Sequence, residues 1–331
     1  MSKYLVFNIE SLENLKFSST NVQSDSEDTN EYIPGTSIRG AYIYRYMIKK
    51  DIKDINQGEH RDKLLNGKIK FLNAYPIYAN KRGMPLPKVY FARKDELKSE
   101  QNKIDMYPGL GQDLGAGYGK VRACEFVGWE KDSFYRIKVD KISNLHINKM
   151  NNKEPNKLFM YEAIKAGQSF QGIIKVEDDE YIEEVREIFE NTIVYLGGSK
   201  GSGYGKCQIG NISIMEENPE LEYFDQSLKG QEIYLLALSD IIYRNEYGEY
   251  KTYIEEKDLE KELGLEKVEF IDSSIETKAI TNFNNKWNCS TPIINGIKAG
   301  SVLKYRITEE LNLDSIKKFM DKGIGERRID G

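Results

Sequence analysis

Apolar and polar residues alternate along several short segments, and this period of two predicts β-strands over residues 4–10, 207–212 and 233–238. Two charged segments follow the helical period instead. Residues 179–191 carry one apolar stripe, made of Ile182, Val185, Ile188 and Phe189. A second stripe, in residues 313–320, is made of Leu313, Ile316 and Phe319 or Met320. Strands and helices therefore mix along the chain, which is typical of an α+β fold.

Part of this pattern occurs twice. The tetrapeptide Ile164-Lys165-Ala166-Gly167 recurs as Ile297-Lys298-Ala299-Gly300, and each copy leads into an alternating strand, an amphipathic helix and a glycine-containing loop. Two such units predict the duplication of one α+β module. We expect the first module over residues 1–216, with an insertion over about 66–162, and the second over 217–331. The chain stops at Gly331 inside the second glycine loop, so we expect a second module truncated at its C-terminus.

The first glycine loop has five glycines within residues 197–205. Residues without a Cβ let the backbone approach a ligand closely, and the nearby Lys200 and Lys206 favour an anionic one. The loop leads into a strand, with a helix before it, and it lacks Gly-Lys-Ser/Thr, which argues against a nucleotide-triphosphate site. The alternative is a hairpin tip in which the glycines serve only the turn. Arg327 and Arg328 beside the second loop favour a polyanion that both loops contact.

Residues 33–41 read Ile-Pro-Gly-Thr-Ser-Ile-Arg-Gly-Ala and predict a turn followed by a helix over about 38–50, capped by Thr36 or Ser37. Free amides at a helix start attract phosphate. Cations outnumber acids in residues 39–70, and tyrosines stand at positions 42, 44 and 46. This composition suits single-stranded nucleic acid. A capped amphipathic helix with a solvated charged face explains it too, and on this segment alone that explanation is favoured.

Composition narrows the class of protein. The 331 residues carry a formal net charge of −5, which argues against polyanion binding over the whole surface but leaves room for a local basic groove. We find no run of apolar residues long enough for a membrane span, and no signal peptide at the N-terminus. The cysteines are odd in number and far apart, at positions 124, 207 and 289. A disulfide framework is therefore not expected, and the simplest location is the cytoplasm.

Catalytic chemistry has little support. His60 and His146 are the only histidines, and no Cys-x-x-Cys occurs, so a zinc site is not expected. A structural or RNA-stacking role for His146 is favoured over a general base. Asp25 and Asp28 lie in a polar segment that could hold a metal ion at a scissile phosphate. A disordered acidic loop is the favoured explanation there, and no cofactor is expected.

Together these motifs resemble the RAMP superfamily of CRISPR–Cas proteins. Residues 33–41 are similar to its I-P-G-S/T-S-apolar-K/R-G segment, and Gly197–Gly205 resembles its glycine-rich loop. With residues 71–76, 158–163 and 323–331, the chain looks most like the large double-RAMP subunit of type III-D effector complexes. That subunit is a relative of the one that caps the 5′ repeat-derived tag of the CRISPR RNA. The second glycine loop departs from the family by stopping where Phe-Gly-Arg is expected.

The resemblance implies two tandem ferredoxin-like (RRM-like) domains and a non-catalytic role. The subunit would bind the CRISPR RNA tag and dock the backbone RAMP and large subunits. Carried over by position, Gly35, Ser37 and Arg39 would contact RNA from the first helix start, and Gly198, Lys200, Gly203 and Tyr204 from the glycine loop. Arg45, Lys206, Arg327 and Arg328 complete the predicted RNA-binding set.

Three alternatives stay open. A RAMP nuclease would cleave target RNA with Asp25 or Asp28 and Mg²⁺, although the two-module length disfavours it. A CRISPR RNA-processing endonuclease would use His60 or His146. A protein-docking assembly subunit would have no RNA affinity.

Overall fold

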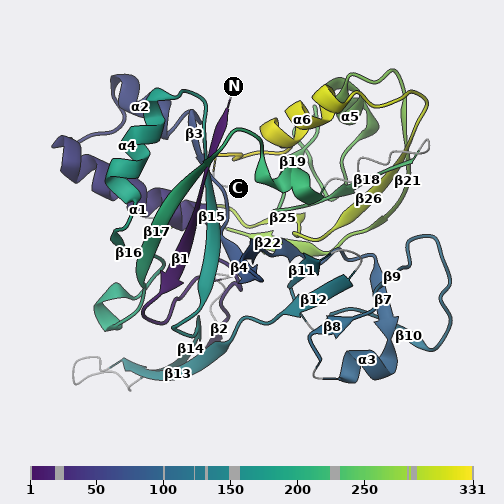
Figure 1. The fold of residues 1–331 in the computed structure, drawn as a ribbon, viewed down its shortest axis with the longest axis horizontal. Helices are drawn as coiled ribbons and strands as arrows, with labels where there is room; N and C mark the ends of the chain where they lie inside the picture. Colours follow the sequence, from purple (N-terminus) through teal and green to yellow (C-terminus); the bar gives the residue numbers. More distant parts are fainter. Residues whose placement is uncertain are drawn as a thin grey trace.

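The computed structural model describes residues 2–18, 26–99, 101–122, 124–130, 133–148, 157–223, 232–281, 283–284 and 289–329 (Figure 1). It is a mixed α/β structure in which nearly all strand pairs are antiparallel. Among these residues, no helix is long and apolar enough to cross a membrane. Residues up to 223 form the first half of the molecule and residues from 232 onward form the second half.

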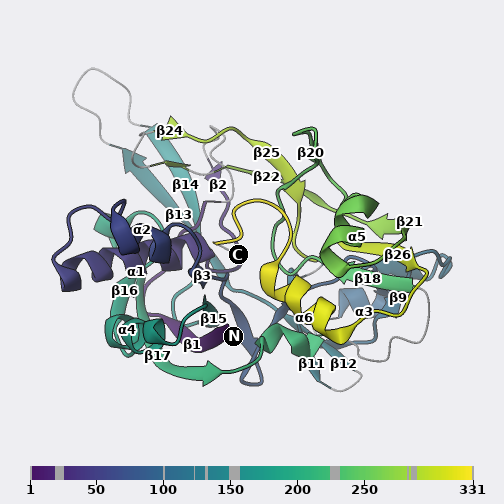
Figure 2. The same cartoon turned by 90° about the horizontal axis from the view of Figure 1, so that it is seen from above.

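A seven-stranded sheet organises the first half, in the order β16-β17-β1-β15-β4-β5, with β3 also beside β15. Its strands are β1 (Lys3–Ser11), β3 (Ile69–Phe71), β4 (Tyr75–Tyr78), β5 (Lys81–Arg82), β15 (Ser169–Val176), β16 (Ile193–Tyr195) and β17 (Lys206–Met215). Helices α1 (Gly35–Lys50), α2 (Gly58–Leu64) and α4 (Glu180–Phe189) lie on one side of this sheet (Figures 1 and 2). The chain order β1-α1-β3-β15-α4-β17, with β17, β1, β15 and β3 side by side, is consistent with a ferredoxin-like fold.

The core of the first half lies between the sheet and the helices. The alternation of β1 buries Leu5, Phe7 and Ile9 on the helix side. Phe7 and Tyr42 each meet the ring of Phe189 edge-on, with centroids 5.7 and 5.8 Å apart. The apolar stripe predicted for residues 179–191 therefore faces this core, as its helical period requires.

Between β4 and β15 the chain builds smaller sheets and a projecting hairpin. The small sheets contain β6 (Met84–Pro85), β7 (Tyr90–Arg93), β8 (Lys103–Ile104), β9 (Tyr107–Pro108), β10 (Tyr118–Lys120), β11 (Phe126–Glu130) and β12 (Ser133–Ile137), with α3 (Lys94–Lys98) beside β7. The hairpin is β13 (Lys141–Asn148) and β14 (Lys157–Ile164), and β2 (Ser26–Glu27) runs parallel to β14.

The second half contains a three-stranded antiparallel sheet, β18-β26-β21, packed against two helices. These elements are β18 (Glu232–Leu236), α5 (Glu256–Leu263), β21 (Val268–Ser274), β26 (Val302–Ile307) and α6 (Leu313–Lys322). Three strand pairs accompany them: β19 (Tyr243–Arg244) with β20 (Tyr250–Lys251), β22 (Thr277–Ile280) with β25 (Ile294–Ile297), and β23 (Phe283–Asn284) with β24 (Cys289–Ser290). Two 3₁₀ turns complete the structure, η1 (Lys200–Ser202) and η2 (Pro219–Tyr223).

The repeated tetrapeptide makes the same backbone bonds in both halves. Leu15 and Ile164 exchange two hydrogen bonds of 2.9 and 2.8 Å, and Ile241 and Ile297 exchange two of 2.8 and 2.9 Å. Nearby, an amide of the tetrapeptide donates to an Asx side chain in each half, in the pairs Ala166 to Asn14 and Ala299 to Asp240. Ile164–Gly167 and Ile297–Gly300 therefore occupy equivalent positions. The predicted module boundaries themselves stay predictions.

Two local expectations are wrong. Helix α1 begins at Gly35, its N-cap is Pro34, and neither Thr36 nor Ser37 caps it. The Asn73 side chain caps the first turn instead, because its Oδ1 accepts the Gly35 N–H at 2.9 Å. The loop before Lys206 is also preceded by the short strand β16, not directly by a helix.

Buried polar contacts fix the two halves to each other. The Tyr75 hydroxyl donates to the Leu238 carbonyl. Lys175 Nζ lies 2.8 Å from the Asp321 carboxylate at the end of α6. Within the first half, Arg82 and Glu220 pair at 2.6 Å with their side chains only 6% and 13% exposed, and this holds η2 against β5 just before the second half begins. A large cleft beside these contacts is lined by residues of both halves.

A cation-lined cleft as candidate nucleic-acid interface

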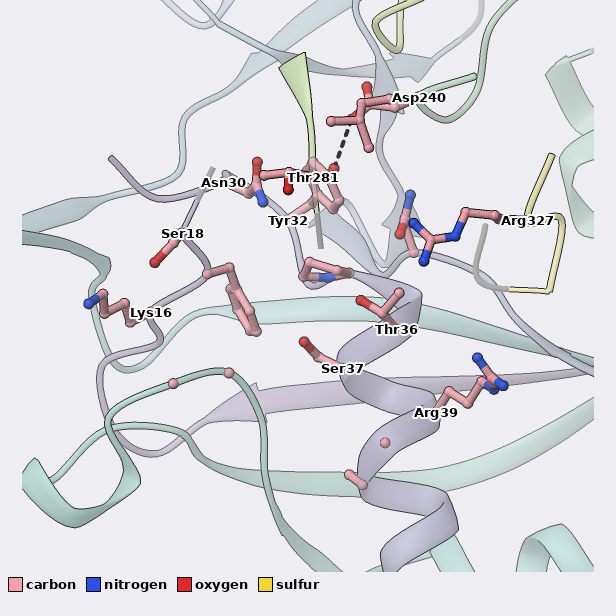
Figure 3. A pocket seen from close by; sticks show the side chains of 18 of the residues that line it. Lys16, Ser18, Asn30, Tyr32, Thr36, Ser37, Arg39, Asp240, Thr281 and Arg327 are labelled. Atoms are coloured by element: carbon pink, nitrogen blue, oxygen red, sulfur yellow. Dashed lines mark hydrogen bonds between the residues drawn. The ribbon is translucent and has the colours of Figure 1, made fainter. Parts of the chain in front are cut away.

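The cleft has a volume of about 1130 Å³ and is walled by both halves of the chain. Thr36, Ser37 and Arg39 project from α1 on one wall, while Asp240 and Arg327 come from the second half (Figure 3). Both glycine loops reach this cleft, the first with Gly197, Gly198 and Lys200 and the second with Glu326 and Arg327. The tertiary fold therefore brings together motifs that are far apart in the sequence.

The start of α1 gives the cleft a polar floor. No acidic residue lies in the first turn, so the positive end of the helix dipole is not neutralised within the helix. Arg39 lies one turn in, where its Nε donates to the Leu64 carbonyl at 3.1 Å. That bond positions the guanidinium at the edge of the cleft. The guanidinium and the helix dipole both favour an anion at this wall, although the Gly35 and Ser37 amides are already bonded to Asn73 and to the Pro34 carbonyl.

The first glycine loop needs its first glycine for steric reasons. Gly197 has φ of 82°, and a Cβ there would collide with the Lys16 carbonyl oxygen. The next amide, that of Gly198, donates to the same carbonyl at 3.0 Å. Ser199 is also left-handed, with φ of 59°. The turn directs Lys200 to the cleft.

The second glycine loop repeats this geometry. Gly325 has φ of 97°, and a Cβ there would lie 2.7 Å from the Ile242 carbonyl oxygen. The Glu326 amide donates to that carbonyl at 2.8 Å, and Arg327 is left-handed with φ of 59°. A bulky residue in this conformation is uncommon and strained. Two loops of the same design thus meet at one cleft.

Cations dominate the electrostatics of the cleft. Its lining includes Lys16, Arg39, Arg45, Lys200, Lys278 and Arg327. The acids are Asp240 and Glu326, and each is paired: Asp240 with Lys278 at 2.8 Å, and Glu326 with Arg244 at 3.2 Å. Burial and the Asp240 carboxylate raise the pKa of the nearby Tyr32 well above its usual value, so this hydroxyl stays protonated. In a protein of net charge −5, this local excess of cations has the character that a polyanion would require.

The structure brings part of the predicted RNA-binding set into the cleft. Its lining contains Ser37, Arg39, Arg45, Gly198, Lys200 and Arg327. Gly35 begins the helix beside it. Arg45 also has a structural role, because its Nε donates to the Ile188 carbonyl at 2.8 Å and ties α1 to the end of α4.

The other predicted residues lie elsewhere. Tyr204 is 4% exposed, and its hydroxyl accepts a hydrogen bond of 2.8 Å from Asn144 of the hairpin. Arg328 folds back to donate to the Gly325 carbonyl at 2.7 Å and borders a second cavity. Gly203 and Lys206 are also outside the cleft lining. Their direct contact with RNA stays a prediction.

Among the three tyrosines considered for base stacking, only Tyr44 is free to stack. It is 67% exposed and lines the cleft, whereas Tyr42 and Tyr46 are buried in the core. Phe17 and Tyr195 also line the cleft. The spacing of 42 and 46 by one helical turn signals a core stripe, which explains their burial.

Several cleft residues carry no signal that the sequence alone reveals. Lys16, Ser18, Asn30, Tyr32, Asp240, Lys278 and Thr281 line the site and come from loops or from β22. Asp240 occupies the position of Asn14 in the second half, an equivalence that the hydrogen bonds of the repeated tetrapeptide reveal and the sequence alone does not. The others stand in no recognisable motif.

The candidate catalytic residues are scattered. Asp28 is exposed beside β2, and Asp25 lies outside the described residues. His146 is on β13, where only its backbone is described, opposite Phe159. His60 Nδ1 lies 2.8 Å from the Tyr46 hydroxyl, which joins α2 to α1. Neither Asp28 nor His60 lines the cleft.

Comparison with known families matches residues 9–208 to the RAMP superfamily. No curated protein matches the chain. Among solved structures, a chain of the type III-B Cmr-beta complex bound to cognate target RNA and AMPPnP is 13% identical, with 98% of this chain and 90% of that chain covered and a TM-score of 0.47. A chain of a type IV-B CRISPR complex is 12% identical over 69% of this chain and 94% of that chain, with a TM-score of 0.34. At these values the structural likeness carries no functional argument.

Proposed function

The chain belongs to the RAMP superfamily, and from this premise we propose that it is a CRISPR RNA-binding subunit of a type III effector complex. In this proposal the cleft holds the 5′ repeat-derived tag of the CRISPR RNA, and other surfaces dock the backbone RAMP and large subunits. The observation that carries the proposal is the cleft itself. Six cationic side chains and two glycine loops line it, against two acids, of which Asp240 is paired with one of the six, Lys278, and Glu326 with Arg244 outside the lining.

Single-stranded RNA is the ligand that this lining suits. Arg39, Lys200 and Arg327 can neutralise phosphates, and the exposed Tyr44 offers a ring on which a base can stack. The bare backbone of Gly198 permits close approach of a strand, since a Cβ there would meet no atom within 4 Å. We propose that the chain is built of tandem ferredoxin-like modules and that each module contributes one glycine loop. This would explain why two loops with the same backbone geometry face one ligand.

We propose a binding role and not a catalytic one. His60 is engaged by Tyr46, and Asp28 is exposed and is not among the residues that line the cleft. The cleft chemistry is that of phosphate neutralisation and stacking. A nuclease would need a general base or metal ligands at the bound phosphate, and the proposal assigns none.

Fluorescence anisotropy with a labelled CRISPR repeat RNA and a composition-matched scramble, each over a salt series, tests the proposal. We expect tighter binding to the repeat RNA and a log–log salt slope that falls by about 0.7 for each phosphate contact removed by Arg39→Ala, Lys200→Ala or Arg327→Ala. Arg306→Ala is the matched control, because this cation lies on the second-half sheet and pairs with Glu232 and Glu269. Equal weak binding to both RNAs, unchanged in the cleft variants, would overturn the proposal.

A further inference from the structure

One wall of the cleft carries a hydrogen-bond network that joins the two halves of the chain. Lys278 Nζ, on β22, donates to Asp240 at 2.8 Å, to Asn30 Oδ1 at 3.0 Å and to the Tyr32 hydroxyl at 3.2 Å. An ammonium group has three N–H bonds, so these three acceptors use all of them. The Asp240 carboxylate also neutralises the charge of Lys278. This lysine is therefore structural and is not available to bind a phosphate.

The other polar groups of the network are engaged as well, with one exception. The Tyr32 hydroxyl donates to Asp240 at 3.2 Å, and the second Asp240 oxygen accepts the Ala299 amide at 2.9 Å. The exception is the side-chain nitrogen of Asn30, which donates to no acceptor in the described part of the chain. Asn30 lines the cleft, so the network presents an unused donor group to it.

The orientation of the Asn30 amide follows from the chemistry of its partner. Lysine can only donate, so the oxygen of the amide faces Lys278 and the nitrogen faces away from it. The backbone is held too, because the Asn30 N–H donates to the Phe17 carbonyl at 2.9 Å. Figure 3 shows Asn30 beside Tyr32 and Thr281 on this wall. A donor that cannot turn to become an acceptor discriminates between ligands that offer acceptors and ligands that offer donors.

A nucleic-acid base is the group that such a donor suits in a cleft of this kind. Phosphates are attracted to Arg39 and Lys200, which carry their charges on the first-half side of the cleft. Ile280 stands two residues after Lys278 on β22, on the same face of the strand, and also lines the cleft. A flat base therefore finds an apolar surface and a hydrogen-bond donor on the same wall.

The fixed donor separates two classes of base. An unrestrained asparagine recognises adenine through its oxygen and its nitrogen together. In Asn30 the oxygen is engaged by Lys278, so only donation remains. Guanine and uracil carry a keto oxygen, O6 or O4, where adenine and cytosine carry an amino group. An amino group opposite the Asn30 nitrogen would bring two donors together with no acceptor between them.

We propose that Asn30 selects a keto base, guanine or uracil, at one position of the RNA bound in the cleft. Its amide nitrogen donates to the exocyclic oxygen of that base, and the contact with Lys278 prevents the amide from turning. The inference rests on the proposed function, because it names a feature that the cleft recognises in its RNA.

Base changes in the RNA, combined with variants of Asn30, test the inference. The probe is the labelled repeat RNA, with each tag position in turn carrying guanine or adenine, and uracil or cytosine. At one position we expect the wild type to bind the keto base at least about fivefold more tightly than the amino base. Asn30→Ala should reduce this ratio below about twofold. Asn30→Asp keeps the acceptor for Lys278 and turns a second acceptor to the cleft, so the preference should reverse.

The matched control is Asn295→Asp, which adds the same charge at an exposed position of β25 outside the cleft lining and should keep the wild-type ratio. If the alanine variant folds poorly, Asn30→Asp decides alone, because it retains the Lys278 contact. An unchanged ratio in the Asn30 variants, while the chain still prefers the repeat RNA to the scramble, overturns this inference only. Equal weak binding of the wild type to the repeat RNA and the scramble overturns the proposed function and this inference together.

Discussion

The hydroxyl of Tyr32 donates a hydrogen bond of 3.2 Å to the carboxylate of Asp240, across the junction between the two halves of the chain (Figure 3). Lys278 Nζ lies 2.8 Å from the same carboxylate oxygen. The other oxygen of Asp240 accepts the Ala299 amide at 2.9 Å. Both oxygens are therefore engaged, and this cluster sets the position of the second-half wall of the cleft.

Replacing Asp240 should destabilise the protein strongly. Asp240→Ala leaves the Lys278 ammonium, only 19% exposed, without its counter-charge, and we expect a loss of about 3 kcal/mol in the free energy of unfolding. Asp240→Asn should cost less, since it keeps an acceptor for Ala299. Urea unfolding measures both. Glu246→Ala is the control, because its ion pair with Lys257 is long and exposed and should change stability by less than about 0.5 kcal/mol. Similar losses in Asp240→Ala and the control would contradict this role.

Two glycines of the first glycine loop, Gly197 and Gly201, should respond differently to alanine. Gly197→Ala forces a Cβ into the Lys16 carbonyl at φ of 82°, so we expect a loss of about 2–3 kcal/mol and weaker RNA binding. Gly201→Ala meets open space and should change stability by less than about 0.5 kcal/mol. Thermal unfolding of both variants, followed by RNA titration, checks this. If Gly197→Ala and Gly201→Ala had equal stability and RNA affinity, the conformation of the loop would not depend on a glycine at position 197.

Elements with a local signal were predictable from the sequence. β1, α4 and α6 follow from the period of two or 3.6, because one face of each element is buried by a single neighbouring layer. The N-cap of α1 was not predictable, since its first amide is satisfied by Asn73, which is 38 residues away. Local capping rules give no information about a partner at that distance.

The cleft was predictable only in part, for a similar reason. Arg39, Gly198 and Lys200 stand in motifs whose composition already suggests an anion. The Lys16 carbonyl accepts the Gly198 amide beside the cleft, and the Lys278 ammonium is held there by the Asp240 carboxylate and by the Asn30 side chain of the first half. These placements depend on tertiary contacts that no single segment encodes. The burial of Tyr204 likewise depends on its contact with the distant Asn144.

Tyr204 should contribute to stability more than to RNA affinity. Tyr204→Phe removes the acceptor for the Asn144 amide, and we expect a loss of about 1 kcal/mol in the free energy of unfolding. RNA affinity of the folded variant should change less than twofold, since the side chain is 4% exposed and outside the cleft. Asn144→Ala is the matched variant, and the double variant should lose less than the sum of both. A large affinity loss in Tyr204→Phe with unchanged stability would instead support the predicted direct contact.

Acidification should weaken the contact between the insertion and the second half. Burial acts to raise the pKa of Glu125, but the ammonium groups of Lys298 and Lys88, at 2.8 and 3.2 Å, outweigh it and hold the pKa below 4.5. A lowered carboxyl pKa contributes stability above 4.5 that is lost as pH falls below that value. We expect the urea midpoint of the wild type to fall more steeply below pH 4.5 than that of Glu125→Gln. If the urea midpoints of the wild type and of Glu125→Gln fell equally with pH, Glu125 would not contribute to the pH dependence of stability.

Arg327 and Ser199 offer a test that separates charge from backbone strain at the two loops. Both residues have φ of 59°, a conformation that glycine adopts without strain, so glycine at either position should relieve the backbone. Ser199→Gly should raise stability by about 0.5–1 kcal/mol and leave RNA affinity unchanged. Arg327→Gly should lower RNA affinity and the salt slope, because it removes a cation from the cleft, without lowering stability to the same degree. If both glycine variants lost RNA affinity equally, loop geometry and not the Arg327 charge would control binding at this wall.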